Sequence, residues 1–192
     1  AEELLRAEIQ RLFPQDEIVG EELGTTKGTS GFQWIIDPID GTKSFIHGTP
    51  LFGTLIGLLA GEECVAGVCR FPALREVVSA RRGAGAYWQT ADGSIRRAQV
   101  SHVEKLTDSL FCYTSVGGWL QVNRLGTFEK LCRHSRLARG WGDCYGHMLV
   151  ATGRAEVMID PLLNPWDAAA LVPIILEAGG VFMDWTGTTT IH

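Results

Sequence analysis

The stretch Trp34-Ile-Ile-Asp-Pro-Ile-Asp-Gly-Thr-Lys-Ser-Phe45 decides which fold to expect. It opens with three large apolar residues, a run that favours a buried strand. We expect this strand to end at Asp37-Pro38, because proline has no N–H to donate to a neighbouring strand. Asp40-Gly41 then predicts a turn, and Thr42 is a suitable N-cap for a short helix that runs through Phe45.

Two carboxylates of this stretch, Asp37 and Asp40, are three residues apart, with the carbonyl of Ile39 between them. Hard oxygen ligands suit Mg²⁺, which proteins hold through one or two carboxylates together with substrate phosphates. The N–H groups of Gly41 and Thr42, at the start of a helix, could receive a phosphate. The stretch therefore predicts metal-assisted phosphate chemistry. The alternative is that both aspartates are ordinary turn and capping residues.

Further carboxylates come from both sides of this stretch. The segment Ile18-Val19-Gly20-Glu21-Glu22 predicts a short strand that ends in two acids, and Glu21 could complete a two-metal site. The alternative is a solvated pair of acids. Asp167 lies close to the start of a helix predicted from Asn164-Pro165. By itself, this position predicts only that Asp167 interacts favourably with the helix dipole, which would stabilise the helix by about 0.3–1 kcal/mol.

The rest of the chain alternates between predicted helices and strands without a strict β-α-β period. We expect helices at residues 2–13, 128–132, 142–152 and 164–178, the last one bent by Pro173. We expect further strands at residues 51–59, 63–71, 77–80, 85–88, 110–115, 155–159 and 181–185, and loops at 25–31 and 117–118. This pattern predicts one domain over residues 1–192, a layered mixed α/β (α+β) sandwich rather than a doubly wound sheet.

The composition argues against several classes of protein. The 192 residues are 45% hydrophobic and 20% charged, as in soluble globular proteins. The net charge of −5 argues against binding to nucleic acid, and no apolar run approaches the ~20 residues of a membrane span. No signal peptide is evident. Five cysteines without a C-x-x-C pair predict free thiols in a reducing cytoplasm, and the histidines show no metal-ligand spacing.

Three motifs together resemble the Mg²⁺-dependent, lithium-sensitive phosphatases related to inositol monophosphatase. They are residues 34–45, the segment Gly20-Glu-Glu22, and Trp166-Asp-Ala-Ala-Ala170 with Glu177-Ala-Gly-Gly180. They occur in the family's order and cover the chain from about Val19 to Gly180. The resemblance implies a five-layer α/β/α/β/α sandwich, a small-molecule phosphate ester as substrate, and a homodimer.

The resemblance also implies a role for each matching position. Gly41 and Thr42 look like phosphate-binding amides, and the Thr42 hydroxyl looks like part of the relay that activates a water. One metal ion can supply a nucleophilic water while another stabilises the leaving alkoxide, and carboxylates crowded together need cations. Two or three Mg²⁺ ions are implied, with ligands at Glu21, Asp37 (shared between ions), the Ile39 carbonyl, Asp40 and Asp167.

Softer similarities point to one branch of this family. Lys43-Ser-Phe45, Pro50-Leu-Phe-Gly-Thr-Leu-Ile56 and Trp141-Gly-Asp-Cys-Tyr145 look like the histidinol-phosphate phosphatases of histidine biosynthesis. That substrate carries an ammonium and an imidazole, so its pocket should offer acidic or acceptor groups. The candidate substrate contacts are Asp143, Asp160 and Asn164; the alternative for each is a local cap or turn.

The chain departs from the family's pattern at both ends. Family members carry more chain before the first helix, including an acid that helps to activate the water, and usually continue well beyond Trp185. We therefore expect a version of the domain that is shorter at both ends. Two other functions stay open: an inositol, nucleotide or broader small-phosphomonoester phosphatase, and a truncated relative that binds metal or a partner without turnover.

Overall fold

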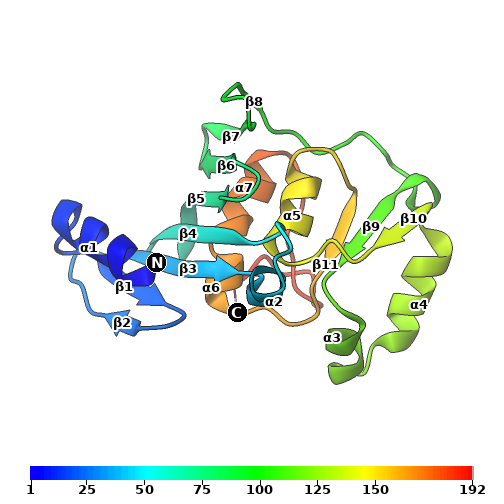
Figure 1. Cartoon of the computed structure of the whole chain (residues 1–192), viewed down its shortest axis with the longest axis horizontal. Coiled ribbons are helices and arrows are strands. Elements are labelled where there is room, and N and C mark those ends of the chain that lie inside the picture. The colour runs from blue at the N-terminus through cyan, green and yellow to red at the C-terminus, as the bar shows by residue number, and fades with distance from the viewer. Residues whose placement is uncertain (192) are drawn as a thin grey trace.

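The computed structural model describes residues 1–191, which contain two β-sheets (Figure 1). The larger sheet has eight strands in the order β2-β1-β3-β4-β5-β6-β7-β8; β1 and β3 run parallel and the other neighbours antiparallel. These strands are β1 (Glu17–Gly20), β2 (Gly24–Thr26), β3 (Phe32–Asp40), β4 (Gly53–Ala60), β5 (Glu63–Phe71), β6 (Glu76–Arg81), β7 (Gly85–Gln89) and β8 (Ile95–Arg97). The smaller sheet is parallel, with β9 (Leu110–Tyr113) between β10 (Leu137–Arg139) and β11 (Val157–Ile159).

The helices form layers on and between these sheets. They are α1 (Glu2–Leu12), α2 (Thr42–Ile46), the 3₁₀ helix η1 (Leu106–Asp108), α3 (Val116–Gln121), α4 (Leu125–His134), α5 (Asp143–Ala151), α6 (Pro165–Ala168) and α7 (Leu171–Glu177). Helices α5, α6 and α7 lie between the two sheets, α1 covers the outer face of the larger sheet, and α3 and α4 lie beside the smaller one (Figure 1). The five-layer α/β/α/β/α order expected from the sequence is confirmed.

The alternation of side chains along β3 determines which residues face the inner helices. Ile36 packs with Ile18 under α1, whereas Ile35 packs with Leu55 and the helices of the inner layer. Successive strand residues point to opposite faces of a sheet, so Asp37 shares the inner face with Ile35. The carboxylate of Asp37 is therefore directed toward the helices between the sheets.

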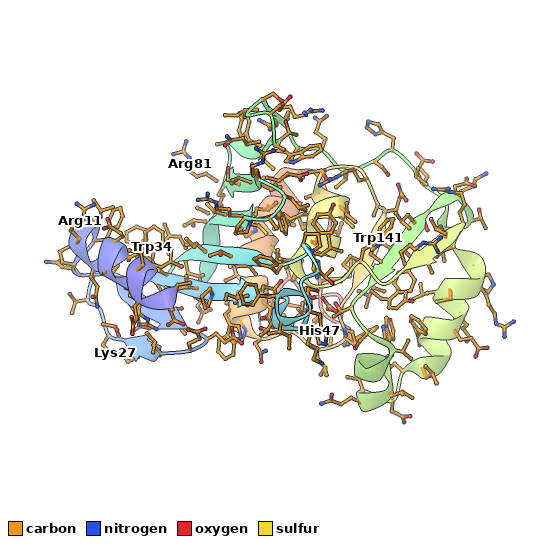
Figure 2. The ribbon with its side chains drawn as sticks, in the orientation of Figure 1. Arg11, Lys27, Trp34, His47, Arg81 and Trp141 are labelled. Carbon is orange, nitrogen blue, oxygen red and sulfur yellow. The ribbon has the colours of Figure 1, made fainter. Side chains whose placement is uncertain are left out.

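Trp34 anchors α1 to the outer face of the same strand. Its ring centroid lies 5.3 Å from that of Phe13, and its indole N–H donates to Asp16 Oδ2 over 2.9 Å. Figure 2 shows the side chain next to α1. The apolar run that predicted the strand is thus divided between two cores, one on each face of the sheet.

Two glycines of the larger sheet allow α6 and α7 to lie directly on it. A Cβ atom at Gly57 of β4 would lie 2.6 Å from the carbonyl carbon of Ala169. A Cβ at Gly67 of β5 would collide with the carbonyl oxygen of Ala170. These contacts are with backbone atoms, so any side chain at either position would push the helices away. The close approach brings Asp167, just before Ala168 at the end of α6, to the surface of the sheet.

The predicted boundaries of the central stretch need two corrections. Strand β3 does not end at Asp37-Pro38 but continues to Asp40, with an irregularity in its register between Asp37 and Asp40. The N-cap of α2 is Gly41 rather than Thr42; Gly41 adopts a left-handed conformation with φ of 78°. Pro38 is accommodated because it lies within this irregularity, where regular pairing is interrupted. Its carbonyl accepts a hydrogen bond from Thr54 Oγ1 over 2.9 Å.

Three other local expectations were wrong for tertiary reasons. Gly117 and Gly118 belong to α3, because Ser115 caps that helix and the fully buried Trp119 packs on Phe128. Residues 25–31 include part of β2, which pairs with β1. Residues 181–185 form no strand, because side chains such as Phe182, which packs on the ring of His147, hold the segment against helices.

The helix predicted from Asn164 is interrupted, as Pro173 implied. It divides into α6 and α7 at Ala169 and Ala170, whose backbone stays in the right-handed helical region. In a regular helix the residue at position 173 would donate its N–H to the carbonyl of Ala169, and proline has no such N–H. The helix is thus interrupted at Ala169, the residue whose carbonyl lacks the hydrogen bond that position 173 would otherwise donate.

Two expectations from composition can be compared with the structure. All five cysteines are free thiols. Of the helices in residues 1–191, none has the length and apolar character needed to cross a lipid bilayer.

Candidate active site

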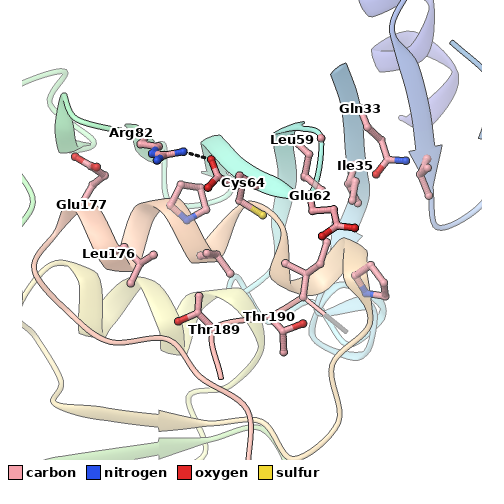
Figure 3. A pocket seen from close by; sticks show the side chains of 17 residues that line it. Gln33, Ile35, Leu59, Glu62, Cys64, Arg82, Leu176, Glu177, Thr189 and Thr190 are labelled. Carbon is pink, nitrogen blue, oxygen red and sulfur yellow. Dashed lines mark hydrogen bonds and ion pairs between the residues drawn. The ribbon is translucent and has the colours of Figure 1, made fainter. Parts of the chain in front are cut away.

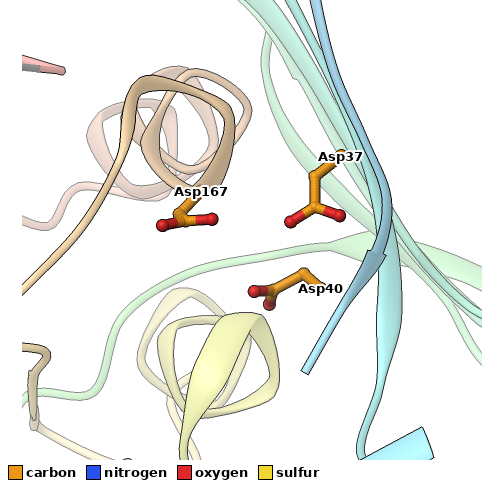
Figure 4. Close-up of side chains that lie close together, drawn as sticks. All are labelled: Asp37, Asp40 and Asp167. Carbon is orange, nitrogen blue, oxygen red and sulfur yellow. The ribbon is translucent and has the colours of Figure 1, made fainter. Parts of the chain in front are cut away.

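Three aspartates converge at the inner face of the larger sheet. Each of Asp37, Asp40 and Asp167 has a carboxylate oxygen within 4.8 Å of the other two, and we call this group the aspartate cluster (Figure 4). Asp37 is only 2% exposed, and the other two are partly buried. Strand β3 supplies two of the acids and helix α6 supplies the third, so the structure brings together three of the acids named in the sequence prediction.

A one-residue bulge in β3 places Asp37 and Asp40 together. Asp37 is opposite Leu55 of β4 and Asp40 is opposite Gly53, so three steps along β3 match two steps along β4. In a regular strand, residues three apart point to opposite faces, but an inserted residue reverses that relation. Asp37 Oδ1 also accepts the N–H of Ile39 over 2.9 Å, which closes the bulge.

Asp167 is fixed by the start of its own helix. Asp167 Oδ2 accepts hydrogen bonds from the backbone N–H (2.7 Å) and the side-chain Nδ2 (3.1 Å) of Asn164, forming a capping box with Pro165 at the first helical position. Asp167 thus takes part in capping α6, a role beyond the helix-dipole partner considered from the sequence, and it belongs to the aspartate cluster as well. Asn164 itself acts as a cap and is exposed.

The aspartate cluster brings together more carboxylates than can all remain ionised without a cation. Burial, followed by repulsion from Asp40 and Glu21, raises the pKa of Asp37 to about 9. Burial also raises the pKa of Asp40 to about 6 and the pKa of Asp167 above its ordinary value. A buried group of carboxylates must bind protons or a cation, and hard oxygen donors match a divalent metal such as Mg²⁺. The residues present thus fit a metal site.

Glu21 lies beside the cluster rather than inside it. It follows β1, its side chain is exposed, and its backbone N–H donates to the carbonyl of Ile36 over 3.2 Å. Its charge is nevertheless close enough to raise the pKa of Asp37. The strand pairing of β1 with β3 thus delivers Glu21 to the edge of the cluster, as its position in the sequence suggested.

The turn after Asp40 places two further predicted residues at the cluster. Thr42 Oγ1 donates to the carbonyl of Ile39 over 3.1 Å, so the hydroxyl and the carbonyl proposed from the sequence are in contact. A Cβ at Gly41 would lie 3.1 Å from Asp143 Oδ2, in addition to the strain of a positive φ. Glycine is therefore required where β3 turns into α2.

A polar cavity of about 100 Å³ joins the cluster to the two other predicted acids. Asp40 and Asp167 line it together with Asp143 and Asp160. Burial, and then repulsion from Asp40 and Asp160, raises the pKa of Asp143 to about 7. Asp160 comes from the end of β11, in the other sheet, so the cavity lies where the two sheets approach each other.

Two residues that line this cavity, Cys144 and His147, were not predicted from the sequence. The backbone N–H of Cys144, at the start of α5, donates to Asp40 Oδ2 over 2.6 Å; a backbone donor leaves no signal in the residue type. His147 was treated as a surface or core residue. It is 6% exposed, and its Nε2 lies 3.5 Å from Asp160 Oδ2. The i, i+4 relation of Asp143 and His147 on α5 was the available clue.

A larger cavity lies elsewhere. It has a volume of about 910 Å³ and is lined by residues of β3, β4 and β5, by α7, and by residues 189–191 (Figure 3). Among the described residues that line it, none belongs to the aspartate cluster. The small acidic cavity therefore contains the aspartates of the cluster, and this larger cavity does not.

Comparison with known proteins places these features in a family. A model of the inositol monophosphatase family matches residues 1–192. A histidinol-phosphatase of Chlorobaculum parvum is 44% identical over 191 residues, a match that covers 100% of this chain and 72% of that protein. A histidinol-phosphatase of Streptomyces coelicolor is 39% identical, with 100% of this chain and 73% of the relative covered.

Solved structures agree with the sequence matches. An inositol monophosphatase from Zymomonas mobilis superposes with a TM-score of 0.86 at 28% sequence identity, covering 99% of this chain and 73% of that one. The chain belongs to the inositol monophosphatase family, whose members are phosphomonoester hydrolases that generally depend on metal ions.

Proposed function

We propose that the protein is a Mg²⁺-dependent phosphomonoesterase that hydrolyses L-histidinol phosphate to L-histidinol and inorganic phosphate. The observation that carries this proposal is the cavity in which Asp40 and Asp167 lie together with Asp143 and Asp160. One part of the cavity suits a metal-bound phosphate, and the other suits a cationic leaving group. Relatives named histidinol-phosphatase, up to 44% identical, support this choice of substrate.

The metal-binding role is assigned to the aspartate cluster with its neighbours. Asp37, Asp40 and Asp167 supply carboxylates. Glu21, whose charge reaches Asp37, and the carbonyl of Ile39 are proposed as further ligands. When bound, two or three Mg²⁺ ions would activate a water and stabilise the leaving oxygen. The side chains contribute fixed positions: the bulge holds Asp37 relative to Asp40, and the capping box holds Asp167.

The phosphate-binding role is assigned to the start of α2. The backbone N–H groups of Gly41 and Thr42 are proposed to bind phosphate oxygens. The hydroxyl proton of Thr42 is directed to the carbonyl of Ile39, so the lone pairs of Oγ1 are available to accept a hydrogen bond from the attacking water. Thr42 would in this way orient the water.

The substrate's cationic part is assigned to the acids on the far side of the cavity. Asp143 and Asp160 are proposed to accept hydrogen bonds from the ammonium and imidazole groups, because charge-assisted bonds to carboxylates are strong. Asn164, a third predicted contact, is engaged with Asp167. We propose that it affects the substrate only through that carboxylate.

Phosphate release from a panel of esters tests the proposed function. The panel contains histidinol phosphate, inositol monophosphate, a 3′-phosphoadenosine nucleotide and fructose bisphosphate, each assayed with Mg²⁺ and with a chelator. We expect Mg²⁺-dependent release with the highest kcat/KM for histidinol phosphate. A preference for inositol monophosphate or another ester would keep the metal site and contradict the roles of Asp143 and Asp160. Absence of release from every ester would contradict the proposal.

We also propose that the protein is a homodimer and that it works in a reducing cytoplasm. The family resemblance suggests the dimer, and the five free thiols suit a reducing compartment. Light scattering coupled to size exclusion would test the dimer through the molar mass in solution.

A further inference from the structure

Glu2 is a charged residue that is completely buried. It lies at the start of α1, its side chain is 0% exposed, and its carboxylate accepts three hydrogen bonds. The donors are Arg6 Nε (2.7 Å), the backbone N–H of Glu22 (2.8 Å) and the backbone N–H of Leu23 (3.2 Å). An ionised carboxylate is buried only where it is well paired, and Glu2 meets that condition through a loop that follows β1.

That loop is the three-residue connection between β1 and β2. Gly20 and Gly24 form the last pair of the ladder, so residues 21–23 make up the connection. Each of its backbone N–H groups has a fixed acceptor: Glu21 donates to the carbonyl of Ile36, and the other two donate to Glu2. The loop is thus held on one side by β3 and on the other by α1.

Arg6 extends the same arrangement to β2. It is 8% exposed, donates from Nη1 to Thr26 Oγ1 over 3.0 Å, and bonds the carbonyl of Gly24 through Nη2. One guanidinium therefore links the carboxylate of Glu2 to both ends of β2. Gly20 completes the arrangement, because a Cβ there would collide with the Glu2 carboxylate.

The loop carries Glu21, whose charge reaches Asp37. The acceptor of the Glu21 N–H is Ile36, the residue immediately before Asp37 in β3. The exposed side chain of Glu21 has little packing of its own to orient it, so its position depends on the backbone of the loop. We propose that Glu2, together with Arg6, is a positioning residue for metal binding: it fixes the loop so that Glu21 faces the aspartate cluster.

This inference rests on the proposed function, in which Glu21 is a metal ligand. A carboxylate is needed at position 2 because it only accepts hydrogen bonds, and three donors point at it. A glutamine would present an N–H₂ group to one of these donors and leave the guanidinium of Arg6 without its counter-charge. Groups that orient metal ligands change metal affinity by about 10–100-fold when they are removed.

The test measures Mg²⁺ binding to the metal-free protein by isothermal titration calorimetry, with Glu2→Gln as the main variant. Glu8→Gln is the matched control, since Glu8 pairs with Arg11 on the same helix but at an exposed position. Arg6→Lys is the second variant: it keeps a positive charge beside Glu2 but loses the fork that reaches β2. Melting temperatures establish that each variant is folded at the temperature of the titration.

We expect Glu2→Gln to raise the Kd for Mg²⁺ about 10-fold or more, Arg6→Lys to raise it less, and Glu8→Gln to leave it unchanged. In phosphate-release assays, saturating Mg²⁺ should restore kcat in Glu2→Gln, because the ligands themselves are intact. A lower melting temperature with an unchanged Kd would overturn the inference and leave only a structural role. If Glu2→Gln does not fold, Arg6→Lys decides in the same way. Wild-type protein that binds no Mg²⁺ would refute the proposed function itself.

Discussion

Asp37 and Asp40 present their carboxylates on the same side of β3 although three residues separate them, because the strand gains one residue between them relative to β4. Without the bulge, one of the two carboxylates would be directed toward the layer of α1. The proposed metal site therefore depends on an irregular strand, and changes that act on this irregularity or on its partners should act on metal binding first.

Replacement of Asp37 by asparagine should abolish most turnover without unfolding the protein. Mutation of residues that only support metal ligands lowers activity by about 10–100-fold. Loss of a proposed ligand, the most buried carboxylate of the cluster, should therefore lower kcat/KM by roughly 100-fold or more. In metal-free buffer the Asp37→Asn melting temperature should equal or exceed that of wild type, because asparagine replaces a buried carboxyl that must take up a proton on folding. Steady-state kinetics and thermal melts check both parts, with the exposed Asp108→Asn as control. Wild-type turnover in Asp37→Asn would contradict the metal assignment.

The metal-free protein should lose stability as the pH rises. The pKa of Asp37 is raised to about 9, and those of Asp40 and Asp143 to about 6 and about 7, each above its value in the unfolded chain. The folded state then binds more protons than the unfolded state, so the free energy of unfolding falls between about pH 4 and about pH 9. Added Mg²⁺ should flatten this decline, because the cation replaces the protons.

Melting temperatures across this pH range, with a chelator and with Mg²⁺, check the pH dependence. The Asp37→Asn variant should show a shallower decline than wild type when the chelator is present. An equal slope in the two proteins would show that the cluster is not responsible.

Replacement of Gly57 by alanine should weaken both the fold and metal binding. The added Cβ would lie 2.6 Å from the backbone of Ala169, and overpacking of this kind costs about 1–3 kcal/mol. In a domain of this size, a melting temperature falls by about 2–4 °C per kcal/mol. The displaced α6 should also raise the Mg²⁺ concentration needed for half-maximal activity, because it carries Asp167.

Gly126→Ala is the matched control for this change. Gly126 lies in α4 with open space around its Cα, so alanine should raise stability by up to about 1 kcal/mol. A stable Gly57→Ala variant with unchanged Mg²⁺ dependence would show that the sheet does not set the position of α6.

Replacement of Asp160 by asparagine should reduce activity on histidinol phosphate selectively. A hydrogen bond to a charged group contributes about 1.5–3 kcal/mol, so kcat/KM for histidinol phosphate should fall roughly 10- to 100-fold. The kcat/KM for p-nitrophenyl phosphate, which has no cationic group, should change little. Equal losses on both substrates would show that Asp160 acts on the site as a whole rather than on the substrate's cation.

Several elements and the main acids could be read from the residues alone. The role of Asp167 at a helix start came from the family resemblance, whereas Asp37 and Asp40 stood out because they follow an apolar run and precede a turn signal. The Ala-rich start of the helix after Asp167 and the Gly-Gly pair at its end were legible for the same reason. Such patterns depend only on residues that are adjacent in the chain, so they can be recognised in the sequence without knowledge of the fold.

Other features depend on neighbours in space. The loop expected at Gly117-Gly118 became a helix because Trp119 is buried against Phe128, and that burial outweighs the low helix propensity of glycine. The strand expected at residues 181–185 did not form, because packing of Phe182 on His147 holds that segment against α5. Local preference indicated what each segment could do, and the surrounding structure chose among the possibilities.

The sequence by itself determined which residues are available for the proposed chemistry, namely the acids and the glycine at position 41, and it contains the apolar runs that build the sheet and helices around them. Only the tertiary structure decided how these residues meet. The bulge between Asp37 and Asp40, the close approach of Ala169 to Gly57, and the contact of Glu2 with residues 22 and 23 depend on strand register and on packing between distant segments. Register and packing are fixed by the whole chain folding together, because no short stretch contains both partners of such a contact.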